Sequence, residues 1–209
     1  MRRLASRSLL LAAVLSGGCA STRPQPPASA KAPTAAEVSA YINAPDACAL
    51  ILGGGFSFEN PQAMEGWLKV SGVVLDAAHL ELTRLGYRVE KAVILGSSEE
   101  RLKAVAIELV NRHCSRIIEI TPFVKSDAPV KQFGFQASVL AIPSSTASKV
   151  PGATTFKTVG EFSKTYTYDL TSEVMQNLSM GEVGRTIARD IDQSGVVTNR
   201  RAEAPPKGS

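Results

Sequence analysis

The stretch CALILGGGF at Cys48–Phe56 decides how this chain folds. Its apolar run is short and ends in glycines, which is typical of a buried strand that leads into a turn. Asn60 and Pro61 come soon after, and they suit the N-cap and the first position of a helix. A buried strand followed by a helix indicates a β-α-β arrangement with a parallel pair of strands.

A long amphipathic helix is predicted after Pro61, because apolar residues recur at spacings of three and four until Gly86 stops the pattern. Val89–Leu95 is the next expected strand. Ser97 and Glu100 form a capping box that opens a second helix, and Arg116–Val124 is the third strand. The apolar face of the first helix consists of Met64, Trp67, Leu68, Ser71, Val74, Leu75, Ala78, Leu82 and Leu85, and that of the second consists of Leu102, Val105, Ala106, Leu109 and Val110.

The second half of the chain changes to a period of two, which is typical of half-buried antiparallel strands. A turn rich in Ser and Pro is expected at Pro143–Gly152. Ser179 and Glu182 form another capping box, so a last helix should end near Asp192. Residues 171–178 either begin that helix or extend the strand. The alternating residues are Phe133, Phe135, Ala137, Val139 and Ala141, then Phe156, Phe162, Tyr166, Tyr168 and Leu170 with Lys164 as an exception, and the last helix should bury Val183, Ile187, Ala188 and Ile191.

The predicted order of elements is β-α-β-α-β-β-β-α, which is an α/β (α+β) fold. Right-handed crossovers place the second and third strands on either side of the first. The hairpin then extends the sheet from the third strand. The prediction is a mixed sheet with strand order 2-1-3-4-5, covered by helices.

The first 18 residues have the three-part layout of a secretory signal. Three arginines come first, Leu9–Leu15 is apolar, and Ser16–Gly18 are small. The apolar run is far shorter than the ~20 residues that a membrane-spanning helix needs. An ordinary secreted protein, cut near Gly18 or Ala20, fits the same layout.

Cys19 follows the small residues, and residues 1–22 resemble the lipobox of bacterial lipoproteins, with Ser16 where leucine is usual. In that family the cysteine is diacylated, the signal is cut before it, and the new amino end is acylated too. The resemblance therefore implies lipidation of Cys19, and two or more acyl chains hold a protein stably on a bilayer. Ala20 and Ser21 form no acidic retention signal, so the resemblance implies the outer membrane, on its periplasmic side.

Residues 20–38 consist largely of Pro, Ala, Ser and Thr, and they cannot bury enough apolar surface to fold. We expect a signal peptide at 1–18, a lipidated cysteine and disordered tether at 19–40, one α/β domain at 41–195 and a disordered tail at 196–209. Anchor, tether and element order together resemble the small α/β domain found at the amino end of TolB and in envelope lipoproteins such as the activators of penicillin-binding proteins and the curli pore lipoprotein. That resemblance covers residues 45–193 and carries no functional residue over to this chain.

Charge and motifs argue against nucleic acid as a partner. Three of the 23 basic residues lie before Cys19, which leaves 20 basic against 19 acidic residues. This balance does not suit a phosphate-binding surface. The segment KQFGFQAS at Lys131–Ser138 resembles the RNP1 strand of RNA-recognition domains, but its phenylalanines equally suit a face covered by helices.

No motif indicates catalysis, a cofactor or a metal. Gly53–Gly55 comes directly after a strand, which is where phosphate-binding loops lie. The residues around these glycines do not have the spacing of a phosphate loop or of a dinucleotide-binding motif. The chain has two histidines, His79 and His113, and no spacing typical of a metal site. We therefore expect a non-catalytic, lipid-anchored protein that binds a protein partner in the cell envelope, as an activator, assembly factor or accessory subunit. The alternative is a small-molecule or cell-wall enzyme that uses the loops at Gly53–Glu59 and Gly96–Ser98.

Two cysteines remain if Cys19 carries lipid. Cys48 begins the first strand and Cys114 precedes the third, and these strands are parallel neighbours in the proposed sheet, ~4.8 Å apart. Their amino ends meet at one edge, and adjacent strands offer roughly the Cα spacing that disulfides need. A Cys48–Cys114 disulfide is therefore predicted for an oxidising compartment; the alternative is that both are small buried residues that never meet.

Overall fold

The computed structural model describes residue 36 and residues 47–54, 61–95, 98–126, 129–147 and 154–199. Within these ranges the chain begins with two strand–helix units, continues with three strands and ends with helices. The elements are β1 (Cys48–Gly54), α2 (Pro61–Arg84), β2 (Val89–Ile94), α3 (Ser98–Arg112), β3 (Cys114–Lys125), β4 (Gln132–Ala147), β5 (Thr154–Asp169), α4 (Ser172–Asn177) and α5 (Met180–Ser194).

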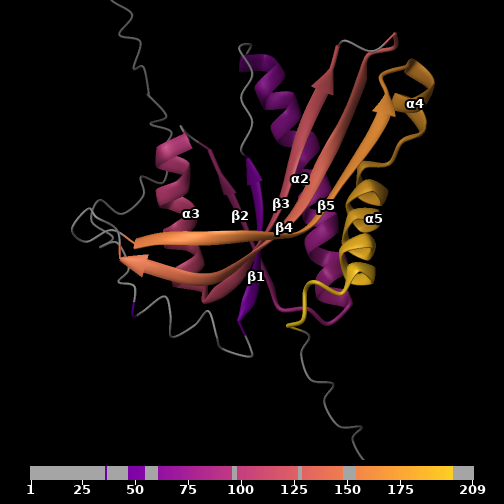
Figure 1. The fold of residues 1–209 in the computed structure, drawn as a ribbon. Coiled ribbons are helices and arrows are strands. Elements are labelled where there is room, and N and C mark those ends of the chain that lie inside the picture. Colours follow the sequence, from indigo (N-terminus) through magenta and orange to yellow (C-terminus); the bar gives the residue numbers. More distant parts are fainter. Residues whose placement is uncertain are drawn as a thin grey trace, which may run out of the picture. The chain divides into compact units, whose positions relative to one another are not determined.

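The strands form one mixed sheet in the order β2-β1-β3-β4-β5, which confirms the predicted fold class and strand order (Figure 1). β1 is parallel to both of its neighbours, whereas β4 is antiparallel to both β3 and β5. All seven residues of β1 are buried. A strand covered on both faces has no polar side, which is why its sequence is a continuous apolar run.

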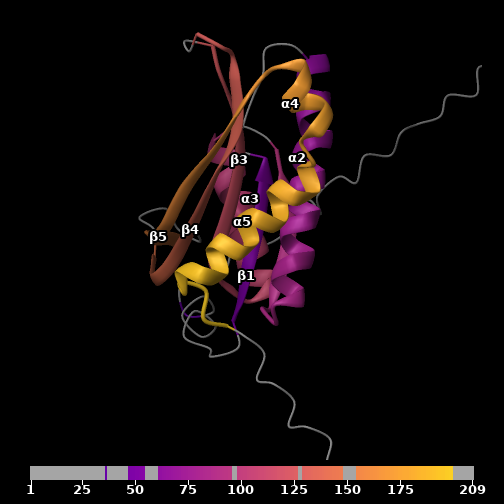
Figure 2. The ribbon, with the colours of Figure 1, turned by 90° about the vertical axis from the view of Figure 1, so that its right-hand side faces the viewer.

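Two helices, α2 and α5, lie side by side on one face of the sheet (Figure 2). Their contact depends on Gly184, because a Cβ atom there would meet the carbonyl oxygen of Val74 and the Cβ atom of Ala77. Ser179 is the N-cap of α5, as predicted, because its side chain accepts a hydrogen bond from the backbone of Glu182. The other half of the predicted capping box is not formed by the Glu182 carboxylate, which accepts hydrogen bonds from Arg185 instead. The predicted buried residues of α5 are also confirmed: Val183, Ile187, Ala188 and Ile191.

The other face carries α3, whose Val105 and Leu109 pack on β1, β2 and β3. The expectation that Leu102 is buried is wrong, because 68% of its surface is exposed. Arg101, one helical turn before Val105, occupies the sheet-facing position instead, and its guanidinium donates to Glu119 of β3 at 2.7 Å. The apolar stripe of α3 therefore begins one turn later than the sequence pattern indicated.

The hairpin of β4 and β5 is longer than expected. Pro143 is predicted to begin a turn, but β4 continues to Ala147 and pairs with β5 on both sides of Pro143. The pairing skips from Ala141 to Ser144, so Pro143 lies in an irregularity of the ladder where its missing N–H group costs no hydrogen bond. Alternation along β4 places Ile142 in the cluster under α3 and Val139 under α2 and α5.

Two further details correct or complete the prediction. Residues 171–178, left open above, contain a separate short helix, α4, and Leu170 lies beyond the end of β5 with 42% of its surface exposed. The expected domain boundary at residue 195 is too early, because Val197 is buried and Asn199 donates hydrogen bonds to the fold. The expected start of the domain at residue 41 lies outside the described residues.

Candidate functional site

An apolar cavity of about 320 Å³ opens at one end of the domain. It lies between the first turns of α2, the start of β4, the end of β5 and the segment from α4 to α5. A volume of this size is at the lower end of the range of ligand pockets, roughly 300–1,000 Å³. The lining residues in the described part of the chain are all apolar: Gly66, Trp67, Val70, Phe133, Leu170, Met175 and Met180.

Aromatic rings form the inner wall of the cavity. Phe133 is 1% exposed, and its ring centroid lies 6.1 Å from that of Trp67 and 5.6 Å from that of Tyr168. Phe133 points to this side of the sheet because its strand alternates, which places Phe135 and Ala137 on the same covered face. The wall therefore adjoins the main core, against which Tyr168 and Val70 pack.

The outer wall is much less packed. α4 has no buried residue, and 49% of the surface of Met175 is exposed. Leu170 continues the apolar surface to the outside and is held in place by its backbone N–H group, which donates to the carbonyl of Lys131 at 2.7 Å. Met175 and Met180 are unbranched and polarisable, so they can adapt to differently shaped occupants.

Hydrogen bonds to one acidic residue of α5 join that helix to β5, ten residues along α5 from Met180 of the cavity lining. Asp190 accepts hydrogen bonds from Tyr166 at 2.6 Å and from Lys164 at 2.7 Å. Burial pushes the pKa of Asp190 up, but these two donors outweigh it and hold that pKa below its ordinary value. Burial, together with the Asp190 carboxylate, raises the pKa of Tyr166. The inward-facing Lys164, an exception in the strand pattern, is thus explained by its partner on α5.

A second ionic contact joins α5 to α2. The side chain of Glu81 is only 6% exposed and accepts hydrogen bonds from Arg84 at 2.8 Å and Arg189 at 3.0 Å. Hydrogen bonding from Arg84 is the main reason that the pKa of Glu81 is lowered to about 2, with burial opposing and Arg189 adding to the effect. These contacts hold the two helices together and lie outside the cavity lining.

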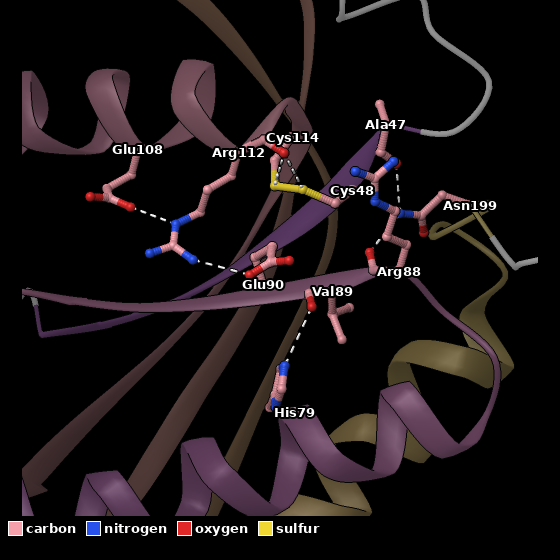
Figure 3. Close-up of a disulfide and its surroundings, with 10 residues drawn as sticks. All are labelled: Ala47, Cys48, His79, Arg88, Val89, Glu90, Glu108, Arg112, Cys114 and Asn199. Atoms are coloured by element: carbon pink, nitrogen blue, oxygen red, sulfur yellow. Dashed lines mark hydrogen bonds and ion pairs between the residues drawn. A yellow bond between two sulfur atoms is a disulfide. The ribbon is translucent and has the colours of Figure 1, made fainter.

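The opposite end of the sheet carries the disulfide (Figure 3). Cys48 and Cys114 are register partners at the amino ends of β1 and β3, their Cα atoms are 4.2 Å apart, and they form a disulfide. The predicted pairing of these two residues is confirmed. Beside it, Arg112 donates to Glu108 and to Glu90, which ties α3 to β2 (Figure 3).

The described chain enters and leaves the fold at this same end. The amide of Asn199 donates to the carbonyl of Ala47 at 2.7 Å and to that of Arg88 at 2.9 Å (Figure 3). α2 connects the two ends of the domain, with Trp67 at the cavity and Arg84 near this edge. The two residues are 17 positions, or about 25 Å, apart along the helix. The cavity therefore faces away from the points where residues 1–46 and 200–209 join the domain.

The remaining predicted positions do not gather at a site. Cys19 lies outside the described residues, as do residues 55–60 and 96–97 of the two loops considered for an enzyme. Phe133 and Phe135 of the RNP1-like segment point into the helix-covered core. His79 contacts the carbonyl of Val89 at 3.3 Å.

A search of the described ranges finds no group of three or more His, Cys, Asp or Glu side chains placed to hold a metal ion. In the same ranges no helix combines the length and the hydropathy of a membrane-spanning segment.

Sequence reasoning missed the cavity. Its residues come from α2, β4, the residue after β5 and both final helices. Trp67, Phe133 and Leu170 were each explained as members of an apolar face, and the other four were not singled out. The available signal was an excess of large apolar residues, Leu170 and Met175, in a short segment that could not bury them. Exposed apolar side chains around a concavity mark binding surfaces.

Comparisons with known proteins add little. No protein-family model and no curated protein matches the chain. Among solved structures, the chain is similar to the PelC dodecamer from Paraburkholderia phytofirmans, with 12% identity and a TM-score of 0.31, over 72% of this chain and 90% of that one. At so low a TM-score the similarity supports no statement about function.

Proposed function

We propose that this chain is a lipid-anchored protein of the bacterial cell envelope whose α/β domain binds a protein partner and catalyses no reaction. The observation that carries the proposal is the apolar cavity at the end of the domain remote from Ala47. None of its lining side chains can take or give a proton, so the cavity is suited to burying apolar groups rather than to chemistry. Exposed apolar surface of this kind is typical of protein–protein contacts.

The anchor is proposed from the pattern that ends in Cys19, and the position of the cavity is consistent with it. The 27 residues at positions 20–46 span at most about 90 Å when fully extended. A domain held by that segment would present the cavity away from its point of attachment.

The anchor is tested by fractionating cells that express the wild type, Cys19→Ala, or the double variant Cys48→Ala/Cys114→Ala. We expect wild type and the double variant in the membrane fraction, and Cys19→Ala released or uncut. The double variant also lacks cysteines but keeps Cys19, so it shows whether release from the membrane depends on Cys19 itself or on the loss of any cysteine. A processed Cys19→Ala protein that stays with the membranes would overturn the anchor.

Partner binding is tested by placing a photoreactive residue at Met175 in the full chain and irradiating intact cells. The matched control is Leu102, which is also a large exposed apolar residue on a helix but lies on the other face of the sheet. We expect a defined protein adduct from position 175 and none from position 102. Adducts from position 102 alone, or from neither position, would refute partner binding through the cavity.

A further inference from the structure

The helical layer over the α2/α5 face of the sheet is incomplete at the cavity. α2 has 24 residues and is about 36 Å long, whereas α5 has 15 residues and is about 22 Å long. α5 therefore accompanies only the lower part of α2, and Figure 2 shows α4 alone beside its upper part. α4 has no buried residue, so it does not fill the layer.

The surface at this gap is suited to another helix. Gly66 lies in the first third of α2 and lines the cavity, and a Cβ atom at this position would meet no described atom within 4 Å. Glycine inside a helix is unfavourable by about 1 kcal/mol relative to alanine. Among the described residues no packing contact requires it, unlike Gly184, which permits the close contact of α5 with α2. A glycine on an open helix surface allows the backbone of an incoming helix to approach closely.

The lining also limits the form of the occupant. All seven lining residues are apolar, so the cavity offers side chains to pack against and no ladder of backbone groups. An extended segment would need hydrogen-bond partners for its main chain, whereas a helix satisfies its own and inserts apolar side chains spaced three or four residues apart. Trp67, Phe133 and the two methionines are themselves apolar, so they can pack against the apolar side chains of such a helix.

From these observations we infer that the cavity binds an amphipathic helix of the partner protein, which completes the helical layer between α2 and α4. The inference rests on the proposed function, because it names the form of the partner proposed there. Gly66 is the point of closest approach. Met175 and Leu170 close over the apolar side of the bound helix.

The test uses the purified full-length chain with Cys19→Ala, and two peptides of about 18 residues built from leucine and lysine. One peptide has leucines spaced for a helical face, and the other has the same composition in strict alternation. The chain has a single tryptophan, so the fluorescence of Trp67 reports on the cavity directly. We expect the helical peptide to change Trp67 emission saturably and to bind at least about tenfold more tightly than its isomer, which is a difference of about 1.4 kcal/mol.

The matched variants are Gly66→Leu and Gly72→Leu, since both glycines are on α2 and both have open space at the Cβ position. Neither substitution should lower the melting temperature. Gly66→Leu should weaken helical-peptide binding about tenfold or more and Gly72→Leu should not. Equal weakening by both variants would overturn the inference.

Other occupants give distinct results. Equal binding of the two peptides, or a stronger Trp67 response to a lauryl-chain detergent below its micellar concentration, would replace the helix by a strand or a hydrocarbon chain. Sedimentation at double mass that is lost in Gly66→Leu would assign the cavity to a second copy of this chain. Each of these results overturns the inference that the occupant is a helix. The proposed function is tested separately by the photoreactive residue at Met175: a protein adduct in cells supports it, and absence of that adduct refutes it.

Discussion

Breaking the Cys48–Cys114 disulfide should destabilise the domain by an amount that follows from its position in the chain. The two residues are 66 positions apart. In the chain-entropy description, closing a loop of that length restricts the unfolded chain by about 15 cal/mol/K, which is about 4 kcal/mol at 25 °C. Both side chains are fully buried at neighbouring strand ends, so the folded state should change little when the bond is removed.

The measurement is urea unfolding of three samples, each carrying Cys19→Ala so that only two cysteines remain. These are the oxidised chain, the same chain after reduction, and the double variant Cys48→Ala/Cys114→Ala. We expect the reduced chain to lose about 4 kcal/mol, which at a slope of about 2 kcal/mol/M lowers the urea midpoint by about 2 M. The double variant should lose slightly more, because two buried sulfur atoms are also removed.

The reduced sample separates the bond from the side chains, since it keeps both sulfur atoms. A midpoint that is the same before and after reduction, with reduction verified by thiol counting, would refute the argument that the cross-link restricts the unfolded chain. A loss confined to the double variant would assign the effect to packing alone.

Two further predictions concern the contact of α5 with α2. Gly184→Ala should destabilise the domain by about 1–2 kcal/mol because its Cβ atom would meet the backbone of α2, while the same change at Gly72, where there is open space, should stabilise it by up to about 1 kcal/mol; chemical denaturation of both variants checks the opposite signs. The pKa of the Glu81 carboxyl group is lowered to about 2, first by hydrogen bonding from Arg84 and also by Arg189. The ionised carboxylate therefore stabilises the folded domain fully above about pH 4.5, and this contribution is lost as the pH falls toward 2. In urea titrations between about pH 5 and pH 2.5 the wild type should therefore lose stability more steeply than Glu81→Gln, and parallel curves would contradict this.

Local pattern in the sequence was sufficient for the order of the sheet and for most of its elements, but not for α4 or for the length of the β4–β5 hairpin. The continuous apolar run at Cys48–Gly54 predicted a strand buried on both faces, and the handedness of crossovers then placed its neighbours. Once β1 and β3 were neighbours, the pairing of Cys48 with Cys114 followed from their equal position along the two strands. These features depend on periodicity and chain connectivity, which are properties of the sequence itself.

Only the tertiary structure decided which residues face the sheet in α3, how β4 continues past Pro143 and where the helical layer leaves a cavity. Whether Leu102 or Arg101 faces the sheet depended on Glu119, which is on a different strand. Pro143 stays in β4 because the ladder with β5 tolerates an irregularity there. The cavity exists because α5 is too short to cover the upper part of α2, and the lengths of two helices reveal a gap only after they have been packed side by side. Periodicity states which side of an element is apolar, but the partner that covers each turn of it is set by contacts between distant segments.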